Sequence, residues 1–498
     1  MTAARLSTSG APDALVRMAE PDFGALIDLI FRRHPAREWG SFAWFGWRDT
    51  PGGLVLTLAG LAPPEPGDLD ESEDILKIQS RYMTRVARRA ERQPFAVGVI
   101  HSHPEGAPPR PSALDDDMDS HLADFLSGFA PARPYASLIF SRLDGKLAAS
   151  GRIFFAGGWR TVQRIMVERR PDIETWPHGE PPPPAAAAPE RVARFSSAFG
   201  EEAHQRLRRS TVAVIGAGGT GSAAIPILAR AGIGRIIVAD IDRVSESNLE
   251  RMHGSMPIHA QQGTPKALLA KRHVAAIDPS IRVDAYMGRL PQTEIIDAVA
   301  SADVILGCTD QQHSRVALSE MAIRYLVPAI DCAGLIEGRD GRVTGQIIQL
   351  TRFLADDPCP YCRSMVDPTR AAIELLSPEE REAKRAALKV TRGPDPTETP
   401  QIDTVGYITT VSGTFAAGYA IGWMTGRFDP PFQRMQMNFV AEGLGVTDRP
   451  QKKRANCRCA GLRGSADQGA DRALVSAPSH WPPVERIDGP IEGPLASG

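Results

Sequence analysis

Two histidines separated by one residue, with an acidic segment after them, could hold a metal ion. His101 and His103 follow an apolar run at residues 95–100 that predicts a strand, and Asp115 comes after a proline-rich loop. Side chains at i and i+2 of a strand project to the same face, so both imidazoles can reach one ion. Asp115 as a third ligand would leave one tetrahedral position open, which is the arrangement of catalytic zinc.

A glycine-rich turn predicts a site for a phosphate-bearing ligand. The turn follows an apolar strand expected at residues 211–215, and its glycines are Gly216, Gly218, Gly219 and Gly221. Glycines let the backbone approach a phosphate closely, and free N–H groups at the start of the following helix favour an anion. Asp240 ends the next expected strand, where an acid can hold a ribose hydroxyl. A dinucleotide-binding enzyme fits these residues as well as a nucleotide-binding one.

The polar residues that follow favour a triphosphate over a redox cofactor. Asn248, Arg251 and Lys266 come after Asp240, and Asp310 ends a later predicted strand at residues 303–306. Arginine and lysine would neutralise phosphate charge as pyrophosphate leaves an attacked α-phosphorus. A nicotinamide cofactor has no evident need for these residues in this order.

Four of the six cysteines form two close pairs late in the chain. Cys359 and Cys362 make a CxxC pair, and Cys457 and Cys459 make a CxC pair. Two such pairs predict a closed, tetrahedral zinc site that holds structure together and does no chemistry. Four reduced, unliganded thiols are the alternative. The other two cysteines, Cys308 and Cys332, are expected on or beside core strands.

The elements that must position these residues fall into two domains, as a length of 498 residues suggests. The first domain, at residues 15–170, is predicted to begin with a helix over 14–34 and to close with a helix over 159–170. A spacer rich in proline and alanine, 171–189, predicts that the domains fold separately. The second domain spans 190–462, with helices expected over 191–210 and 407–424. The remainder, 463–498, has little to bury and is predicted to be a disordered tail.

Composition excludes several classes of function. The formal net charge of −2 argues against a general role at nucleic acids or membrane surfaces. The first 20 residues lack a signal-peptide pattern, and no stretch offers 18 unbroken apolar residues. We therefore expect a cytoplasmic protein with no membrane and no nucleic-acid partner.

The first domain resembles the JAB/MPN metalloprotease family, whose best-known members cut isopeptide bonds to ubiquitin. The resemblance rests on HSHP at 101–104, SxxD from Ser112 to Asp115, and Glu38 upstream, before a glycine. It implies a mixed-sheet fold in which His101, His103 and Asp115 bind zinc. Glu38 would be the general base that deprotonates the water at the metal, and Ser112 a donor to the oxyanion. The loop before Ser112 is one residue longer than the common spacing, which leaves Asp116 as an alternative ligand.

The second domain resembles the ThiF/MoeB-like adenylating family of ubiquitin-activating enzymes and their bacterial relatives. The motifs are GAGGTGS, DIDRVSESNLERM, GTPK and LGCTDQ, which together are specific. The resemblance implies a Rossmann-like α/β domain that uses ATP and Mg²⁺, with Asp310 as the magnesium ligand. It also implies a homodimer in which Arg194 reaches the phosphates of the other subunit. The nucleotide-binding residues it implies are Gly216, Gly218, Gly219, Gly221, Asp240, Asn248, Arg251, Lys266 and Asp310.

The two resemblances together predict a bifunctional enzyme. One domain would adenylate the C-terminus of a ubiquitin-like or sulfur-carrier protein, and the other would cut a peptide or isopeptide bond beside such a terminus. Implied partners include a conjugating enzyme or a target protein. Two alternatives remain, namely a sulfur-carrier activating enzyme for cofactor biosynthesis with a processing peptidase, and an assembly protein whose peptidase domain is degenerate.

Overall fold

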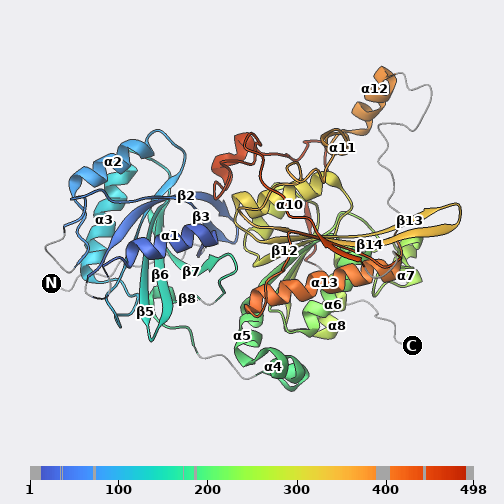
Figure 1. Cartoon of the computed structure of the whole chain (residues 1–498), viewed down its shortest axis with the longest axis horizontal. Coiled ribbons are helices and arrows are strands. Elements are labelled where there is room, and N and C mark those ends of the chain that lie inside the picture. Colours follow the sequence, from blue (N-terminus) through green and yellow to red (C-terminus); the bar gives the residue numbers. More distant parts are fainter. Residues whose placement is uncertain are drawn as a thin grey trace. The chain divides into compact units, whose positions relative to one another are not determined.

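The structure is a computed structural model that describes residues 13–33, 35, 37–70, 75–171, 173–183, 188–388, 404–440 and 445–488. The chain forms two compact units (Figure 1). The first comprises Met1–Ala185 together with Arg324–Leu326 and Leu462–Arg472, and the second comprises the remainder. Both units mix helices with sheets, so the predicted α/β class is confirmed.

The first unit is built on a mixed, eight-stranded sheet with the order β5-β4-β2-β3-β1-β7-β6-β8. Because β5 also pairs with β6, the sheet closes on itself. Strand β1 runs parallel to both β3 and β7, whereas β2 is antiparallel to β3 and β4. The elements are β1 (Ala14–Met18), α1 (Glu20–Ile30), β2 (Gly40–Thr50), β3 (Gly53–Ala62), α2 (Ser80–Ala90), β4 (Ala96–Ser102), α3 (Ala113–Ser127), β5 (Tyr135–Leu143), β6 (Lys146–Phe155), β7 (Gly158–Val167) and β8 (Glu174–Thr175).

Helices bury apolar side chains against both faces of this sheet. Helix α1 places Phe23 and Leu26 in one buried apolar cluster with side chains of β1, β3 and β5. Helices α2 and α3 place Val86 and Leu122 in a second cluster with other side chains of β2 and β4. Alternate residues of each strand point to opposite faces, so the central strands are buried on both sides. Strand β4, which carries His101 and ends just before His103, lies between β2 and β5 in this buried region.

Two predicted helices of the first unit are wrong in part or in whole. The closing helix expected over 159–170 is instead β7, which pairs with β6 and β1. The helix expected from residue 14 begins only at Glu20, because residues 14–18 form β1 between β3 and β7. In both places the hydrogen bonds offered by neighbouring strands override the local helical pattern.

The predicted disordered tail is wrong for the described residues 463–488. A short 3₁₀ helix, η4 (Asp467–Arg472), lies in a segment that belongs to the first unit. There the Oγ1 of Thr57 donates to the carbonyl of Gly464 at 2.7 Å, and Arg48 forms an ion pair with Asp467 at 2.9 Å. Backbones meet closely, since a Cβ on Gly46 would lie 2.4 Å from the Gly464 oxygen. The first unit is therefore assembled from distant parts of the chain.

The second unit contains a nine-stranded sheet with the order β16-β15-β14-β13-β12-β9-β10-β11-β17. Strands β13, β12, β9, β10 and β11 are parallel, which confirms the Rossmann-like expectation. The chain passes from β9 to β10 on one side and later to β12 on the other, so ligands are expected at the carboxyl ends of β9 and β12. The strands are β9 (Thr211–Ile215), β10 (Arg235–Ala239), β11 (Arg282–Met287), β12 (Val304–Gly307), β13 (Ala329–Arg339), β14 (Arg342–Phe353), β15 (Arg434–Asn438), β16 (Gly445–Asp448) and β17 (Glu485–Arg486).

Helices pack on this sheet and shape the region around the glycine-rich turn. Helix α13 (Gly406–Thr425) lies against α6 (Gly219–Arg230), and a Cβ on Gly413 would lie 2.3 Å from the Thr220 oxygen. The predicted buried helix at 407–424 is thus confirmed, whereas the helix expected over 191–210 is broken at Gly200, where φ is +91°. The remaining helices include α4 (Ala193–Phe199), α5 (Glu201–Arg209), α7 (Pro257–Gln261), α8 (Lys266–Ile277), α9 (Thr293–Val299), α10 (Gln312–Arg324), α11 (Pro368–Glu374) and α12 (Pro378–Leu388).

None of the helices formed by the described residues has the length and apolar character needed to cross a membrane.

Candidate active sites and metal centres

The structure brings His101, His103 and Asp115 together. One ligand atom from each lies within 4.8 Å of the others, and all three residues are buried. The Nε2 of His101 is 3.2 Å from Oδ1 of Asp115, and the Nε2 of His103 is 3.8 Å from its Oδ2. Two imidazoles and one carboxylate are a donor set that fits zinc and leaves one position open.

Backbone groups orient the second histidine toward Asp115. The Nδ1 of His103 is 2.9 Å from the carbonyl of Pro108, in the proline-rich loop, and its backbone N–H donates to the carbonyl of Phe140. A carbonyl that accepts the Nδ1 proton fixes the tautomer in which Nε2 is free to bind a metal. The loop, one residue longer than the common spacing, thus supplies an orienting acceptor for His103.

Asp115 lies in the first turn of α3 and forms a reciprocal cap with Ser112. The Ser112 hydroxyl donates to Oδ2 of Asp115 at 2.6 Å, and the backbone N–H of Asp115 donates back to that hydroxyl at 3.2 Å. Burial alone would raise the pKa of Asp115, but the nearby imidazoles of His101 and His103 and the hydrogen bond from Ser112 hold this pKa well below its usual range. The carboxylate is therefore in the charged form that binds a metal.

The alternative ligand, Asp116, points elsewhere. Its carboxylate pairs with the guanidinium of Arg152, a residue of β6. Since Asp115 is the carboxylate that faces both histidines, the geometry favours Asp115 over Asp116 as the third ligand.

Glu38 lies at the edge of this cluster, two residues before the start of β2 at Gly40. Its Oε1 is 3.9 Å from the Nε2 of His103, and its Oε2 accepts the backbone N–H of Leu76 at 3.0 Å. Gly40 allows this approach, because a Cβ there would lie 2.9 Å from the carbonyl oxygen of Ile100 on β4. The carboxylate is placed beside the candidate metal site without being one of the three clustered ligands.

In the second unit, the glycine-rich turn joins β9 to α6. Gly216 adopts a φ of +95°, which favours glycine, and its N–H donates to the carbonyl of Ala239 at 2.8 Å. A Cβ on Gly221 would lie only 1.9 Å from the Gly216 oxygen, whereas one on Gly218 would meet nothing within 4 Å. Gly219 begins α6 and packs beside Thr409. The turn therefore needs glycine for its own backbone at two positions and is open at a third.

Asp240, at the end of β10, is joined to this turn. Its carboxylate accepts the N–H of Ala217 at 2.7 Å and the N–H of Asp242 at 2.8 Å. Burial raises the pKa of Asp240, and the charge of Lys266 opposes this rise. The acid expected to hold a ribose also stabilises the turn.

The cationic residues gather near the same edge of the sheet. Lys266 begins α8 and pairs with Asp242 at 2.9 Å. Arg251 donates to the carbonyl of Ser247 at 3.0 Å and remains partly exposed, while Asn248 accepts the N–H of Ser245 at 3.1 Å. The backbone N–H of His253, two residues after Arg251, donates to the Ser222 hydroxyl on α6 at 2.9 Å. This bond joins the segment carrying Asn248 and Arg251 to the helix that begins at the turn.

Asp310 follows β12, the strand next to β9, and is exposed. The adjacent Thr309 lies beside Gly216, since a Cβ on that glycine would be 3.0 Å from the threonine methyl group. Arg315, on the helix after Asp310, forms an ion pair with the buried Asp331 at 3.3 Å. Arg194 is exposed on α4 and is not among the residues that meet at the turn.

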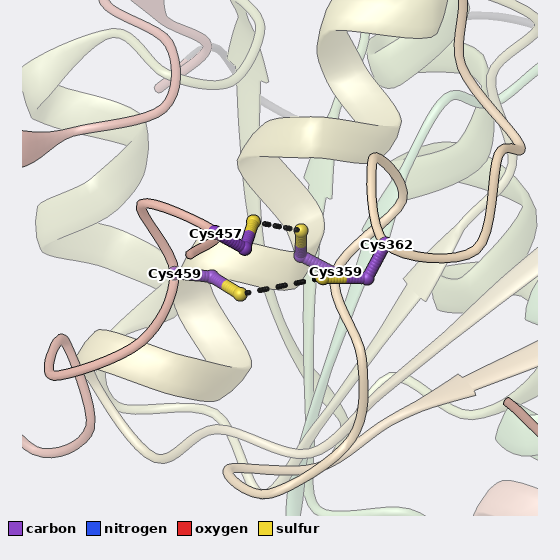
Figure 2. Close-up of side chains that lie close together, drawn as sticks. All are labelled: Cys359, Cys362, Cys457 and Cys459. Atoms are coloured by element: carbon purple, nitrogen blue, oxygen red, sulfur yellow. Dashed lines mark hydrogen bonds between the residues drawn. The ribbon is translucent and has the colours of Figure 1, made fainter. Parts of the chain in front are cut away.

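The four cysteines also meet, as Figure 2 shows. The sulfurs of Cys359 and Cys457 are 3.6 Å apart, and those of Cys362 and Cys459 are 3.8 Å apart. Hydrogen bonds from its neighbours, chiefly Cys359, lower the pKa of Cys459 to about 5. Sulfur separations of this size fit one tetrahedral zinc, so the CxC spacing of the second pair is compatible with the site.

Comparison with known families decides the classification. The model of the ThiF family matches residues 190–460, which is more than half of the chain. The chain belongs to the ThiF family. A second model, described as prokaryotic homologs of the JAB domain, matches residues 52–152. The recognition of a JAB domain joined to a ThiF domain is thus confirmed. The JAB match includes the histidines, Ser112 and Asp115, and begins after Glu38.

Curated relatives resemble part of this ThiF protein. It is 34% identical over 144 residues to a sulfur carrier protein adenylyltransferase of Thermus thermophilus, covering 29% of this chain and 52% of the relative. It is 33% identical over 165 residues to a SAMP-activating enzyme E1 of Haloferax volcanii, covering 33% of this chain and 56% of the relative. The chain thus spans about half the length of these relatives. A crystal structure of E. coli MccB with ATP matches 55% of this chain and 75% of its own, with 17% identity and a TM-score of 0.40.

We expect Cys459→Ser to reduce the zinc content of this ThiF protein from two ions per chain to one. The substitution removes one of four clustered thiols, and loss of a structural zinc also removes folding free energy. Metal analysis and thermal unfolding measure both effects. Cys308→Ser, which changes a half-buried cysteine outside the cluster, is the matched control. Two ions retained in Cys459→Ser would show that these cysteines hold no zinc.

Proposed function

We propose that the chain is a bifunctional enzyme of a ubiquitin-like modifier pathway. The second unit would adenylate the C-terminus of the modifier with ATP, and the first would cut a peptide or isopeptide bond at that terminus. The observation that supports this most directly is that each unit gathers most of its own candidate residues. They lie at the carboxyl ends of β9, β10 and β12 in one unit and around β4 in the other.

For adenylation, the open glycine turn and the N-terminus of α6 offer backbone N–H groups to phosphates. Lys266 and Arg251 would neutralise the charge that develops on the leaving pyrophosphate. Asp240, fixed by the N–H groups of Ala217 and Asp242, would hold the ribose, and Asn248 would help to hold the nucleotide. Asp310, exposed beside the turn, would hold Mg²⁺, which supplies charge neutralisation when bound.

For peptide cleavage, His101, His103 and Asp115 would hold zinc, which supplies Lewis-acid polarisation when bound. Glu38 lies within reach of the same space and would take a proton from the attacking water and return it to the leaving amine. The Ser112 hydroxyl, now donating to Asp115, could redirect its proton to a developing oxyanion only if that bond is exchanged. The donor set, and not a completed geometry, therefore supports the peptidase role.

Relatives named for the adenylylation of a sulfur carrier protein and for SAMP activation support a carrier or modifier protein as the substrate class. Both proposed chemistries act on a protein C-terminus, and fusion would hold them at high local concentration around one substrate. Co-expression of the chain with its neighbouring genes, followed by identification of the protein captured as an acyl-adenylate, tests the proposal. Capture of no protein in the presence of ATP and Mg²⁺ would contradict it.

Two other functions predict different outcomes. If the chain serves only sulfur transfer for cofactor biosynthesis, the adenylate is consumed by a sulfur donor and no target protein is modified. If it is an assembly protein with a degenerate first unit, zinc binds but no ubiquitin-like fusion is cleaved. A homodimer in which Arg194 acts on the partner's nucleotide is a further proposal, and mixing Arg194→Ala with Asp310→Ala subunits tests it by recovery of activity in the mixed dimer.

We expect the enzyme to stop at the acyl-adenylate and to form no thioester of its own. The sequence predicts a polar crossover loop at 392–399, which lies outside the described residues, and no cysteine lies between Cys362 and Cys457 in the sequence. Cys332 is the one exception to consider, but burial, followed by its contact with Cys308, raises its pKa well above the usual range. A thiol of this kind is a poor nucleophile.

Non-reducing gels of enzyme, modifier and ATP with Mg²⁺, run with and without added thiol, check this expectation. The result expected is no thiol-sensitive adduct. An adduct that disappears in Cys332→Ser would overturn it and identify the nucleophile, and Cys308→Ser serves as the control for a neighbouring thiol.

A further inference from the structure

A buried arginine of the first unit lies under the helix that carries Asp115. The Nε of Arg152, on β6, donates to Oδ2 of Asp119 at 2.7 Å, and its guanidinium also pairs with Asp116. Both carboxylates belong to α3. The arginine side chain is 11% exposed, and the side chain of Asp119 is fully buried. A single guanidinium therefore binds two successive turns of α3 from the sheet.

Aromatic residues complete this network on the sheet side. The hydroxyl of Tyr135, on β5, donates to Oδ1 of Asp119 at 2.8 Å. The guanidinium carbon of Arg152 lies 5.2 Å from the ring centroid of Trp159, on β7. Through these contacts α3 is fixed to three strands, β5, β6 and β7. Burying such charges is costly unless each has partners, and apolar residues often stabilise a fold equally well. Stability alone is thus a weak reason for this arrangement.

The position of α3 decides whether the candidate metal ligands meet. Helix α3 supplies Asp115 and is capped by Ser112, whereas His101 lies on β4 and His103 directly follows this strand. Asp116 is the neighbour of Asp115, and Asp119 lies one turn beyond it. A rotation of α3 about its axis, or a slide along it, would move Asp115 away from the Nε2 of His101, now 3.2 Å from its Oδ1. Functional groups must be held to within about 0.5 Å for such sites to work.

We propose that Arg152 is a positioning residue for the zinc site, holding α3 so that Asp115 faces the two histidines. This inference rests on the proposed metal-binding role of His101, His103 and Asp115. It adds a residue outside the ligand set whose fork-shaped guanidinium binds two carboxylates at once, which lysine cannot do. Arg152 acts through Asp116 and Asp119 and touches none of the ligands' coordinating atoms.

Metal affinity of the full-length chain is the decisive measurement. Chelator competition with Zn²⁺ gives the affinity, and Co²⁺ distinguishes the two sites, because sulfur-to-cobalt charge transfer arises only at the cysteine cluster. We expect Arg152→Met to weaken metal binding at the histidine site by about 10–100-fold, the usual effect of losing an outer partner of a ligand. Arg152→Lys should weaken metal binding at the histidine site by a smaller factor. Metal binding at the cysteine cluster should be unchanged in both variants.

Arg160→Met is the matched control. Arg160 is also a buried arginine of this unit, but its partners are Asp49, at 2.9 Å, and the ring of Phe155, at 5.1 Å, neither of which belongs to α3. The Arg160→Met variant should bind metal with an affinity near that of the parent protein. Near-UV circular dichroism and thermal unfolding report whether each variant is folded. If Arg152→Met does not fold, Asp116→Asn, which keeps the shape of the side chain, is the variant to test. It should also weaken metal binding at the histidine site.

Folded Arg152→Met or Asp116→Asn protein that binds zinc with parent affinity would overturn the inference. So would a loss in Arg152→Met no larger than the loss in Arg160→Met. Failure of the proposed peptidase function is seen separately, as a parent protein that binds zinc normally and cleaves no modifier fusion. The positioning role is read from affinity and does not depend on that result.

Discussion

Glu38→Gln is expected to abolish peptide-bond cleavage while leaving zinc bound. The Glu38 carboxylate lies beside His103 but outside the three clustered ligands, so the substitution removes a base without removing a ligand. Glutamine can still accept the N–H of Leu76, which the Oε2 of Glu38 accepts in this structure. Loss of a general base typically costs about 10²–10⁴-fold in rate. Cleavage of a modifier fusion and zinc content are the two measurements.

A surface glutamate of the same unit provides the control. Glu65→Gln changes a side chain that is 69% exposed and pairs with Arg85, and it should leave cleavage unchanged. Cleavage at the parent rate in Glu38→Gln would remove Glu38 from the mechanism. Loss of zinc in that variant would instead show that Glu38 is a ligand.

Asp310→Ala and Arg251→Ala should each eliminate modifier-dependent exchange between ATP and pyrophosphate. Asp310 is exposed and Arg251 partly exposed, so neither substitution opens a cavity in the core. Each removes a charge proposed to act on the phosphates, and removal of one such group typically costs about 10²–10³-fold. Peptidase activity, measured on the same preparations, should be retained, because both residues belong to the second unit.

Exposed residues of the second unit serve as controls for general effects of charge. Two such variants are Glu294→Ala, on α9, and Arg209→Ala, at the end of α5. Both should catalyse exchange between ATP and pyrophosphate at the parent rate. The adenylating assignment fails if exchange persists in both test variants, or if the reaction requires NAD in place of ATP.

The sequence predicts well where chemistry depends on short, contiguous motifs. The glycine turn after β9, the acid after β10 and the histidines at the end of β4 follow from local patterns of strand, turn and helix. The meeting of the glycine turn and Asp240 follows from the rule that parallel strands bring their carboxyl ends to one edge of a sheet. The spacing of the four cysteines predicts that they share a site, and the structure brings their sulfurs within 4.8 Å of one another. The roles of these residues stay predictions.

What could not be predicted depends on partners far away in the chain. The pattern of residues 158–167 fits either a helix or a strand. The segment forms a strand because it pairs with β1, which lies over 140 positions earlier in the chain. Arg152 belongs to no sequence motif, and a single arginine in an expected strand is usually exposed. Its interactions with Asp116 and Asp119 are seen only in the three-dimensional structure.

The segment that completes the first unit has a consequence for synthesis on the ribosome. Residues 13–183 leave the exit tunnel before the partners of Gly46 and Thr57 in Leu462–Arg472, which emerge only after residues 190–460 have been synthesised. At about 5–20 residues per second, the wait is on the order of tens of seconds. During that interval the strand surface that later contacts Leu462–Arg472 is exposed, so we expect co-translational chaperones to bind there. We also expect termination before residue 462 to yield a product that aggregates.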